Sequence, residues 1–337
     1  MADFKTEPSC AVRCWSRQRF RSGAAARDVV CCGPRTRARK GSIVIRDYLA
    51  LTKPTIMLLV IFTGAAALLI EGSLIHEPAR AALFLLGLFM TGGSANALNQ
   101  YFEREIDARM TRTSNRRPLP QGRIAAGRAL WFSIMIGVIG GALLLAIFNW
   151  LTAALSIATI LFYGLFYTLY LKPRTPQNIV IGGAAGAMAP VGAWTAATGT
   201  MGVEPWVMFL IVFLWTPPHF WALALYCKDD YVRARLPMMP VVRGEVATLK
   251  KILIYTALLI GVSLVPVLYG AGWLYLPVAL YLGVKLWSAA RRAWRIRQEA
   301  AYRALFGYSI LYLFALFLAM IADSLLVRYA GLPTVLS

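Results

Sequence analysis

Long stretches without a charged residue limit the possible folds of this chain more than any other feature of its sequence. Each is long enough, or nearly so, for a helix that crosses a hydrocarbon layer, which takes roughly 17–25 apolar residues. The windows are continuously apolar and lack the alternation of barrel strands, so they favour membrane-spanning helices. They cover residues 55–70, 81–102, 129–171, 175–203, 205–227, 252–284 and 304–322.

Two of these windows are long enough for a pair of helices. The window 129–171 contains Phe148-Asn149-Trp150, and the window 252–284 contains Gly270-Ala271-Gly272-Trp273. Turn-forming and interfacial aromatic residues coincide at both points, which indicates a helical hairpin in each window. The sequence therefore predicts an all-α polytopic membrane protein, with nine transmembrane helices in a domain over residues 47–330 and a short tail over 331–337.

The composition excludes most soluble classes of protein. Apolar residues make up 59% of the 337 residues and charged residues 15%, whereas soluble domains have about 45–50% and about 25%. The net charge of +20 follows the predicted topology. With the N-terminus in the cytoplasm, only Arg80, Lys285 and Arg328 of the 35 basic residues fall outside the predicted cytoplasmic segments, as the positive-inside rule requires. We therefore expect a multi-pass membrane protein with no nucleic-acid partner.

Residues 1–46 form a separate basic segment. No apolar core of a secretory signal follows its Lys and Arg residues, and Asp3, Glu7 and Asp28 argue against a transit peptide. We interpret it as a disordered arm that lies on anionic lipid, or as an over-extended gene model. Its four cysteines lack zinc-site spacing and are expected to be free thiols. Without a transit segment, the inner membrane of a bacterium is favoured over the mitochondrial inner membrane.

The few acidic residues gather where two predicted helices reach the cytoplasm. Asn99, Glu103 and Asp107 are spaced by four, which places them on one helix face. Asp229 and Asp230 follow the window 205–227. Stacked carboxylates repel each other unless they share a cation, and Mg²⁺ takes one or two carboxylates together with water and phosphate oxygens. We predict that both acidic pairs bind Mg²⁺, with Glu103, Asp107 and Asp230 as catalytic residues.

Basic and polar residues surround these clusters and suggest a phosphate ligand. Each helix presents its C-terminal, negative end to the site, which favours a cation and repels bare phosphate. Guanidinium and ammonium groups bind phosphate oxygens once a metal is present. Any single Arg can equally mark membrane topology, and Asn178 can equally be a helix N-cap. The predicted substrate-binding residues are Asn99, Arg109, Arg112, Arg116, Lys172, Asn178, His219, Tyr226, Lys228 and Arg233.

Over residues 47–325 these motifs resemble the intramembrane prenyltransferases of the UbiA superfamily, and most closely its protohaem farnesyltransferase branch. The resemblance rests on five stretches that recur in order. Gln100 and Glu103 stand where the wider superfamily has Asp, and Arg233 replaces the usual last Asp of the second motif; both departures are typical of the haem branch. The five stretches are Asn99–Asp107, Arg112–Arg123, Thr175–Gly183, Trp215–Ala224 and Lys228–Pro240.

The resemblance implies a reaction and its participants. A farnesyl group passes from farnesyl diphosphate to a vinyl group of haem B, and water adds to give haem O. Mg²⁺ is the implied cofactor, and the implied partners are these two substrates, the lipid bilayer and a downstream haem A synthase or terminal-oxidase assembly pathway. His219 is either an axial or orienting contact for haem or a residue bonded to a neighbouring helix. Candidate aromatic residues around the allylic cation are Tyr163, Tyr167, Trp194, Trp215, Phe220 and Trp221.

Three alternatives stay open. A secondary transporter also has many helices and membrane-embedded acids, but its coupling carboxylates usually lie near the midplane. A related prenyltransferase acting on a quinone precursor or chlorophyllide differs in its first motif and lacks the stretch around His219. A non-catalytic assembly factor would tolerate loss of the carboxylates.

Overall fold

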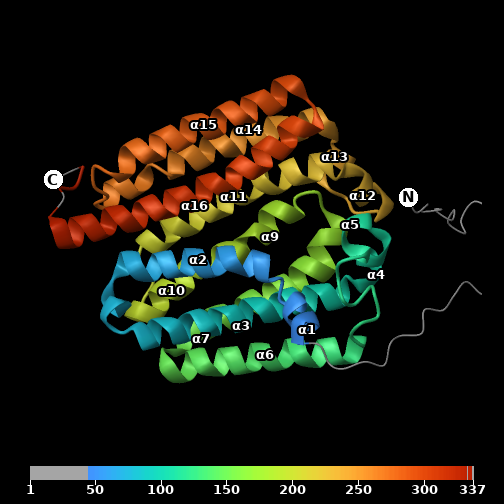
Figure 1. The fold of residues 1–337 in the computed structure, drawn as a ribbon, viewed down its shortest axis with the longest axis horizontal. Helices are drawn as coiled ribbons and strands as arrows, with labels where there is room; N and C mark the ends of the chain where they lie inside the picture. Colours follow the sequence, from blue (N-terminus) through green and yellow to red (C-terminus); the bar gives the residue numbers. More distant parts are fainter. Residues whose placement is uncertain (1–44, 332, 336–337) are drawn as a thin grey trace, which may run out of the picture. The chain divides into compact units, whose positions relative to one another are not determined.

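The computed structural model describes residues 45–331 and 333–335, all of which belong to one compact unit. The predicted N-terminal arm therefore lies outside the described residues except for its last two. The described residues form helices and turns and contain no strand (Figure 1). The sequence prediction of an all-α fold is confirmed.

Eight helical segments of the described chain are long and apolar enough to cross a membrane. A further helix, α15 (Tyr275–Ile296), has 22 residues and packs beside α14 and α16, but it carries Lys285 and three arginines toward its end. Together they agree with the nine predicted membrane helices. The eight segments are Pro54–Glu71, Pro78–Phe102, Ala126–Ile147, Trp150–Arg174, Asn178–Thr198, Glu204–Tyr226, Gly244–Tyr269 and Glu299–Ala330.

Several of these segments consist of consecutive shorter elements. The bounds, in chain order, are α1 Ile45–Leu51, α2 Pro54–Glu71, η1 Ser73–His76, α3 Pro78–Phe102, α4 Arg104–Arg109, α5 Thr111–Ser114, α6 Ala126–Ile147, α7 Trp150–Leu161, η2 Phe162–Leu171, α8 Lys172–Arg174, α9 Asn178–Ala187, α10 Ala189–Thr198, α11 Glu204–Tyr226, α12 Lys228–Arg233, α13 Met239–Val242, α14 Gly244–Val262, η3 Val265–Tyr269, α15 Tyr275–Ile296 and α16 Glu299–Ala330.

Both predicted hairpin breaks occur where expected. Helix α6 ends at Ile147, and Asn149 caps α7 because its Oδ1 accepts from the Thr152 N–H at 2.9 Å. The Asn149 Nδ2 also donates to the Thr195 carbonyl at 2.7 Å, which ties the turn to α10. The second break separates η3 from α15. An aqueous turn is required at each place because the chain cannot reverse inside lipid without leaving backbone groups unpaired.

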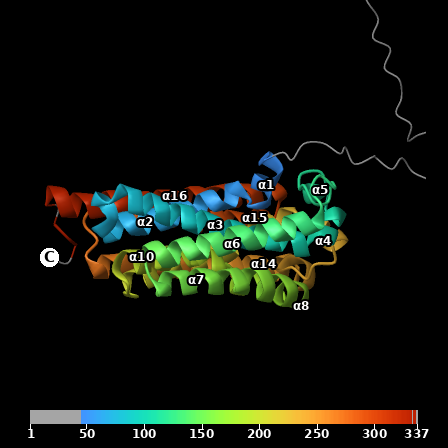
Figure 2. The same cartoon turned by 90° about the horizontal axis from the view of Figure 1, so that it is seen from below.

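Small residues allow the helices to approach one another closely. A Cβ at Gly137 would lie 2.5 Å from the Ser94 Oγ, so this glycine lets α3 and α6 run side by side (Figure 2). A Cβ at Gly182 would lie 2.4 Å from the Tyr167 ring. The sequence interpretation of the glycine-rich runs as packing surfaces agrees with these contacts.

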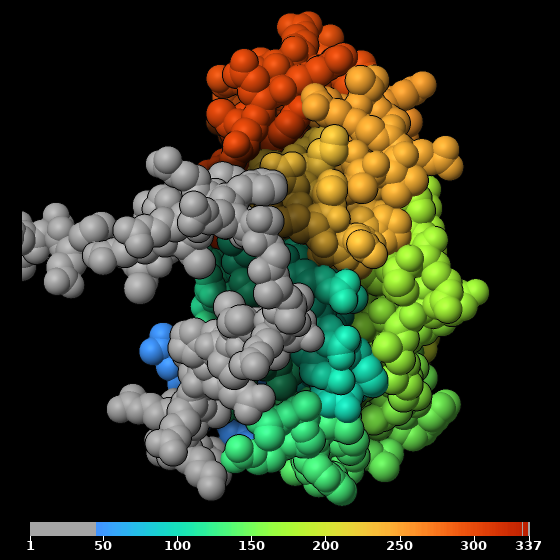
Figure 3. All heavy atoms as spheres, turned by 90° about the vertical axis from the view of Figure 1, so that its right-hand side faces the viewer, coloured from blue at the N-terminus to red at the C-terminus, as the bar shows by residue number. Residues whose placement is uncertain are grey.

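Four short helices gather at one end of the bundle, which we call the polar end: α4, α5, α12 and α13 (Figure 1). Figure 3 looks onto this end, where the segment that follows α3 lies beside the segments near residue 235. The short helix α1 also lies near this end and leads directly into α2. The polar end therefore collects residues from separate parts of the chain.

At the opposite end, the buried carboxylate of Asp323 supports the start of α15. Asp323 is 1% exposed, and its two oxygens accept from the Gly272 N–H at 2.6 Å and the Tyr275 N–H at 3.0 Å. The Gly272 N–H precedes α15 and the Tyr275 N–H begins it, so neither has a backbone acceptor within the helix. We expect Asp323→Ala to lower the free energy of unfolding by about 2–4 kcal/mol, because two buried donors lose their acceptor.

Thermal unfolding of the purified protein in detergent would measure this change. Ser324→Ala is the matched control, because the Ser324 Oγ makes only a 3.4 Å contact with the Ile70 carbonyl. An Asp323→Ala protein as stable as the control would contradict the capping role.

Candidate active site

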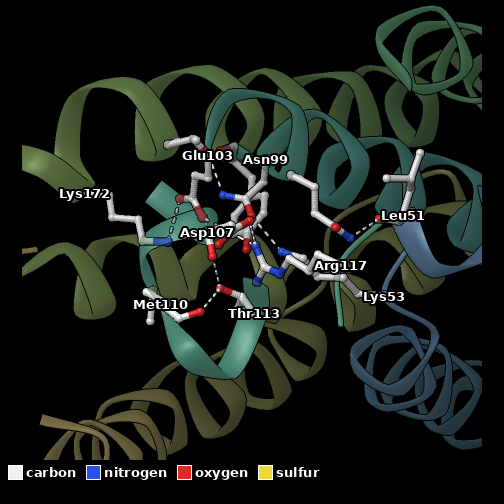
Figure 4. A network of polar contacts seen from close by, with 12 residues as sticks. Leu51, Lys53, Asn99, Glu103, Asp107, Met110, Thr113, Arg117 and Lys172 are labelled. Atoms are coloured by element: carbon white, nitrogen blue, oxygen red, sulfur yellow. Dashed lines mark hydrogen bonds and ion pairs between the residues drawn. The ribbon is translucent and has the colours of Figure 1, made fainter. Parts of the chain in front are cut away.

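Three polar side chains lie together where α3 leaves the membrane-spanning part of the bundle (Figure 4). Asn99 is in the last turn of α3, Glu103 is its C-cap residue, and Asp107 follows one turn later in α4. All three are buried, with exposed fractions of 2%, 3% and 2%. The predicted shared face is therefore present, and it points into the protein rather than toward water.

Three cationic side chains face these residues, and two of them, Lys53 and Lys172, come from distant parts of the chain. The Lys172 Nζ lies 2.5 Å from the Glu103 Oε1. Arg117 pairs with Asp107, and its Nη1 lies 4.0 Å from the Glu103 Oε2. The Lys53 Nζ donates to the Asn99 Oδ1 at 2.7 Å. Each carboxylate thus has a cationic partner, which compensates for its removal from water.

Lys53 reaches the site through the geometry of the α1–α2 connection. Its backbone is left-handed, with φ of 53°, which turns the chain sharply before Pro54. The Gln100 Nε2 donates to the carbonyls of Ala50 and Leu51, at 3.0 Å each, and holds the end of α1 against α3. At position 100 the chain therefore uses an amide for positioning.

A wide, π-type helical segment, η2, packs against α3 and completes this wall of the site. In η2 the Thr168 Oγ1 donates to the Tyr163 carbonyl five residues earlier, at 2.7 Å, and accepts from the Asn99 Nδ2 at 3.0 Å. The rings of Tyr163 and Tyr167 stack with centroids 5.0 Å apart. Because η2 leads into Lys172, this wall combines aromatic rings with a cation. Segments of this kind are frequent at functional sites.

Burial has the largest influence on the ionisation of these groups. Burial would raise the pKa of Glu103, but Lys172 and Lys53 outweigh it, so the pKa of this carboxyl lies below its ordinary value. For Asp107, burial prevails over Arg117, and its pKa is raised. Burial, together with Arg117, lowers the pKa of Lys53 to about 7. The cluster holds three basic side chains and two carboxylates, and this excess of basic groups suits an anionic ligand that brings its own metal.

The second motif lies beside the first but does not merge with it. The Asp230 Oδ1 accepts from the Thr111 Oγ1 at 3.1 Å and pairs with Arg233, and its Oδ2 accepts from the Arg112 N–H at 3.4 Å. Burial would raise the pKa of Asp230, but these hydrogen bonds lower it. Asp229 is exposed next to it. These contacts join α12 to α5.

The donor set of the first cluster fits Mg²⁺. Glu103, Asp107 and the Asn99 Oδ1 are hard oxygen donors, and two carboxylates leave room for water and phosphate oxygens in an octahedral shell. Within the described ranges no three His, Cys, Asp or Glu side chains are close enough to hold one ion. A protein cage for a metal is therefore absent from this part of the chain, and a metal held jointly with a phosphate ligand fits better.

The other predicted binding residues lie around this core. Arg109, Arg112, Arg116 and Lys228 are exposed at the polar end. Asn178 is fully buried at the first position of α9 and does not cap it with its side chain. Its Nδ2 donates to the Thr175 carbonyl at 2.7 Å, while its Oδ1 has no partner among the described residues.

His219 is buried between α11 and α16. Its ring is stacked between Trp215 and Phe306, with centroid distances of 4.3 and 4.4 Å. Its Nδ1 lies 2.8 Å from the Ser309 Oγ. The Ser309 hydroxyl already donates its only hydrogen to the Phe306 carbonyl at 2.6 Å, so His219 must donate from Nδ1. Its Nε2 then keeps a lone pair, because a neutral imidazole carries one N–H.

The remaining aromatic candidates fall into two groups. Phe220 contacts His219 edge-on, and Trp221 is fully buried against Tyr255 of α14. Trp194 instead lies in α10 beside Gly202, at the end opposite the carboxylates (Figure 1). The structure does not support the expectation that Trp194 lines the site, because α10 ends at Thr198, far from the polar end.

Sequence reasoning placed Arg117 only among the basic residues that follow the first motif, and it missed Lys53, Thr168 and Ser309. Arg117 lies in the basic segment after the first motif, and Lys53 precedes a proline at a helix start, so both had a weak local signal. Thr168 and Ser309 had no local signal in the sequence.

Comparison with known proteins places this chain in a family. A profile of the UbiA prenyltransferase family matches residues 59–327. Over 280 residues the chain is 49% identical to the protoheme IX farnesyltransferase of Afipia carboxidovorans, covering 81% of this chain and 88% of the relative. It is 48% identical over 292 residues to the protein of the same name from Gluconacetobacter diazotrophicus, covering 84% and 92%.

Solved structures share the fold at low identity. A structure of digeranylgeranylglyceryl phosphate synthase aligns with a TM-score of 0.69 at 20% identity, over 83% of this chain and 98% of that chain. A UbiA homologue from Archaeoglobus fulgidus bound to DMAPP and Mg²⁺ aligns with a TM-score of 0.55 at 17% identity, over 82% and 99%. The family profile and the close relatives each cover most of the sequence, and the chain belongs to the UbiA prenyltransferase family.

Proposed function

We propose that this protein transfers the farnesyl group of farnesyl diphosphate to a vinyl group of haem B, giving haem O. The observation that carries the proposal is the buried face of Asn99, Glu103 and Asp107, surrounded by three cationic side chains at the end of a membrane helix. The names of the two close relatives support the choice of haem as acceptor.

The charged residues handle the diphosphate. Glu103, Asp107 and the Asn99 amide oxygen would hold Mg²⁺, which supplies a Lewis acid that neutralises the departing diphosphate. Lys172 and Arg117 then exchange their carboxylate partners for phosphate oxygens. When the allylic C–O bond breaks, its electron pair leaves with the diphosphate, and these cations stabilise the new charge.

The aromatic wall and the membrane protect the allylic cation that forms. Tyr163 and Tyr167 offer stacked ring faces beside the charged cluster, and such faces stabilise cations. Exclusion of water at this stage prevents loss of the farnesyl group as an alcohol. The terminal vinyl carbon of haem then forms the new C–C bond, and a water molecule adds to the neighbouring carbon and releases a proton.

His219 is the proposed contact to the acceptor. Its Nε2 lone pair can meet the iron of haem, while Ser309 fixes the tautomer and the two stacked rings fix the plane. We place the protein in the inner membrane of a bacterium with the polar end in the cytoplasm, and the product would pass to a haem A synthase or to terminal-oxidase assembly.

The choice of acceptor has a direct test. Purified protein receives labelled farnesyl diphosphate, Mg²⁺ and either haem B, a quinone precursor or chlorophyllide. We expect the label to appear in a C15-substituted haem only. Label in the quinone precursor would favour the related prenyltransferase, and uptake of label into vesicles without any product would favour a transporter.

For the metal site, we expect Asp107→Asn to lower kcat by at least about 10²-fold, since it removes one of two carboxylates that hold the metal on the leaving group. Release of diphosphate at saturating Mg²⁺ measures the effect. Glu105→Gln is the matched control, because Glu105 is in the same short helix but exposed and paired only with Arg104. Turnover retained by the Asp107 variant, in protein that still inserts into the membrane, would count against the metal site.

For the diphosphate contacts, we expect Lys172→Gln to reduce kcat/KM for farnesyl diphosphate by roughly 10–100-fold, the value of one charge-assisted hydrogen bond. Arg174→Gln should change it little, since the Arg174 guanidinium lies over the Tyr170 ring and bonds backbone carbonyls. Steady-state kinetics with haem B held saturating would separate the two. Equal losses in both variants would argue against a specific role for Lys172.

A further inference from the structure

A continuous row of flat side chains runs between α11 and α16 toward the polar end. In order from the interior it contains Trp215, His219, Phe306 and Tyr226. The first three are stacked, and Tyr226 meets Phe306 edge to face at 5.8 Å. Three of these residues come from α11 and one, Phe306, from α16. The two helices are antiparallel, because Trp215 bonds Ser309 while Tyr226, later in α11, contacts Arg303, earlier in α16.

An arginine closes the row at the surface. The Arg303 guanidinium lies over the Tyr226 ring, 5.4 Å from its centroid. Its acidic partner is Glu299, one turn earlier in α16, and both side chains are more than half exposed. Surface pairs of this kind contribute little, so the guanidinium can exchange Glu299 for another carboxylate at small cost. Arg112 of the segment after α4 also interacts electrostatically with Tyr226 and Cys227.

The two ends of this row suit the centre and one edge of a metal tetrapyrrole. His219 and Tyr226 are seven residues apart, or about 10 Å along a helix. The interior end offers an imidazole lone pair between aromatic rings, which suits a metal at the centre of a flat ring. The surface end offers two guanidinium groups, which suit carboxylate side arms at one edge of that ring.

We propose that this row between α11 and α16 is the acceptor site, and that Arg303 binds a carboxylate side arm of the tetrapyrrole. The inference rests on the proposed function and adds to it. The iron contact at His219 and the carboxylate contact at Arg303 hold the ring at two points. Contact at two points restricts the rotation of the tetrapyrrole ring in its plane. Only part of the ring edge can then face the diphosphate cluster on α3, which provides a basis for the choice of vinyl group.

The test compares Arg303→Gln with Arg297→Gln in the full-length purified protein. Arg297 is the matched control, because it lies at the same end of the bundle but covers the Trp294 ring and donates to the Trp294 carbonyl. With haem B we expect Arg303→Gln to raise the KM for haem about tenfold, leave the KM for farnesyl diphosphate unchanged, and differ clearly from the control.

Haem dimethyl ester, which lacks free carboxylates, identifies the group that Arg303 recognises. Wild type and Arg303→Gln should have the same KM for the ester. Arg303→Lys should recover part of the affinity for haem B, and Glu299→Gln should lower the KM, because it removes the competing carboxylate. An Arg303→Gln protein that matches the control with haem B, or that loses affinity equally for the ester, would overturn the assignment.

Direct titration of haem absorbance separates this inference from the proposed reaction. If wild type binds haem but transfers no farnesyl group to it, the proposed reaction fails, while weaker haem binding by Arg303→Gln would still support the site. Equal dissociation constants for wild type and variant, or no binding of haem by wild type, would overturn the site itself.

Discussion

The pairing of two buried carboxylates with cationic side chains is the interaction on which the rest of the polar end depends. Glu103 and Asp107 lie at the end of a membrane helix and are almost fully removed from water. Buried charges are tolerated only when they are paired and hydrogen-bonded. Lys172 must therefore approach from a separate part of the chain and Arg117 must fold back onto Asp107, and the wide turn of η2 and the connection after α5 place them there.

Because of the same pairing, the proposed reaction requires only an exchange of partners among charged groups. A bound metal can replace the cations at the carboxylates, and the phosphate oxygens of the substrate can replace the carboxylates at the cations. Each group exchanges one partner of opposite charge for another, so no charge in this low-dielectric site is left unpaired. In this proposal the ligand requires only local exchanges of partners at these side chains.

The two substrates would meet walls of different character. The wall formed by α3 and η2 carries the charges and two stacked tyrosines, and suits a diphosphate and an allylic cation. The wall formed by α11 and α16 carries a row of flat side chains with a histidine of fixed tautomer, and suits a planar acceptor. The second acidic motif, which follows α11, is tied to Thr111 and Arg112 in the segment after α4 and so links the two walls.

Local sequence determined the helices and one face of the site. Lipid forbids unpaired backbone groups, so each charge-free window had to be a helix, and the four-residue spacing of Asn99, Glu103 and Asp107 places them together through the helical period alone. Only the tertiary structure decided their partners. Lys53, Thr168 and Ser309 bond to residues 46, 69 and 90 positions away, and no local pattern encodes such contacts, because they depend on how separate helices pack against one another.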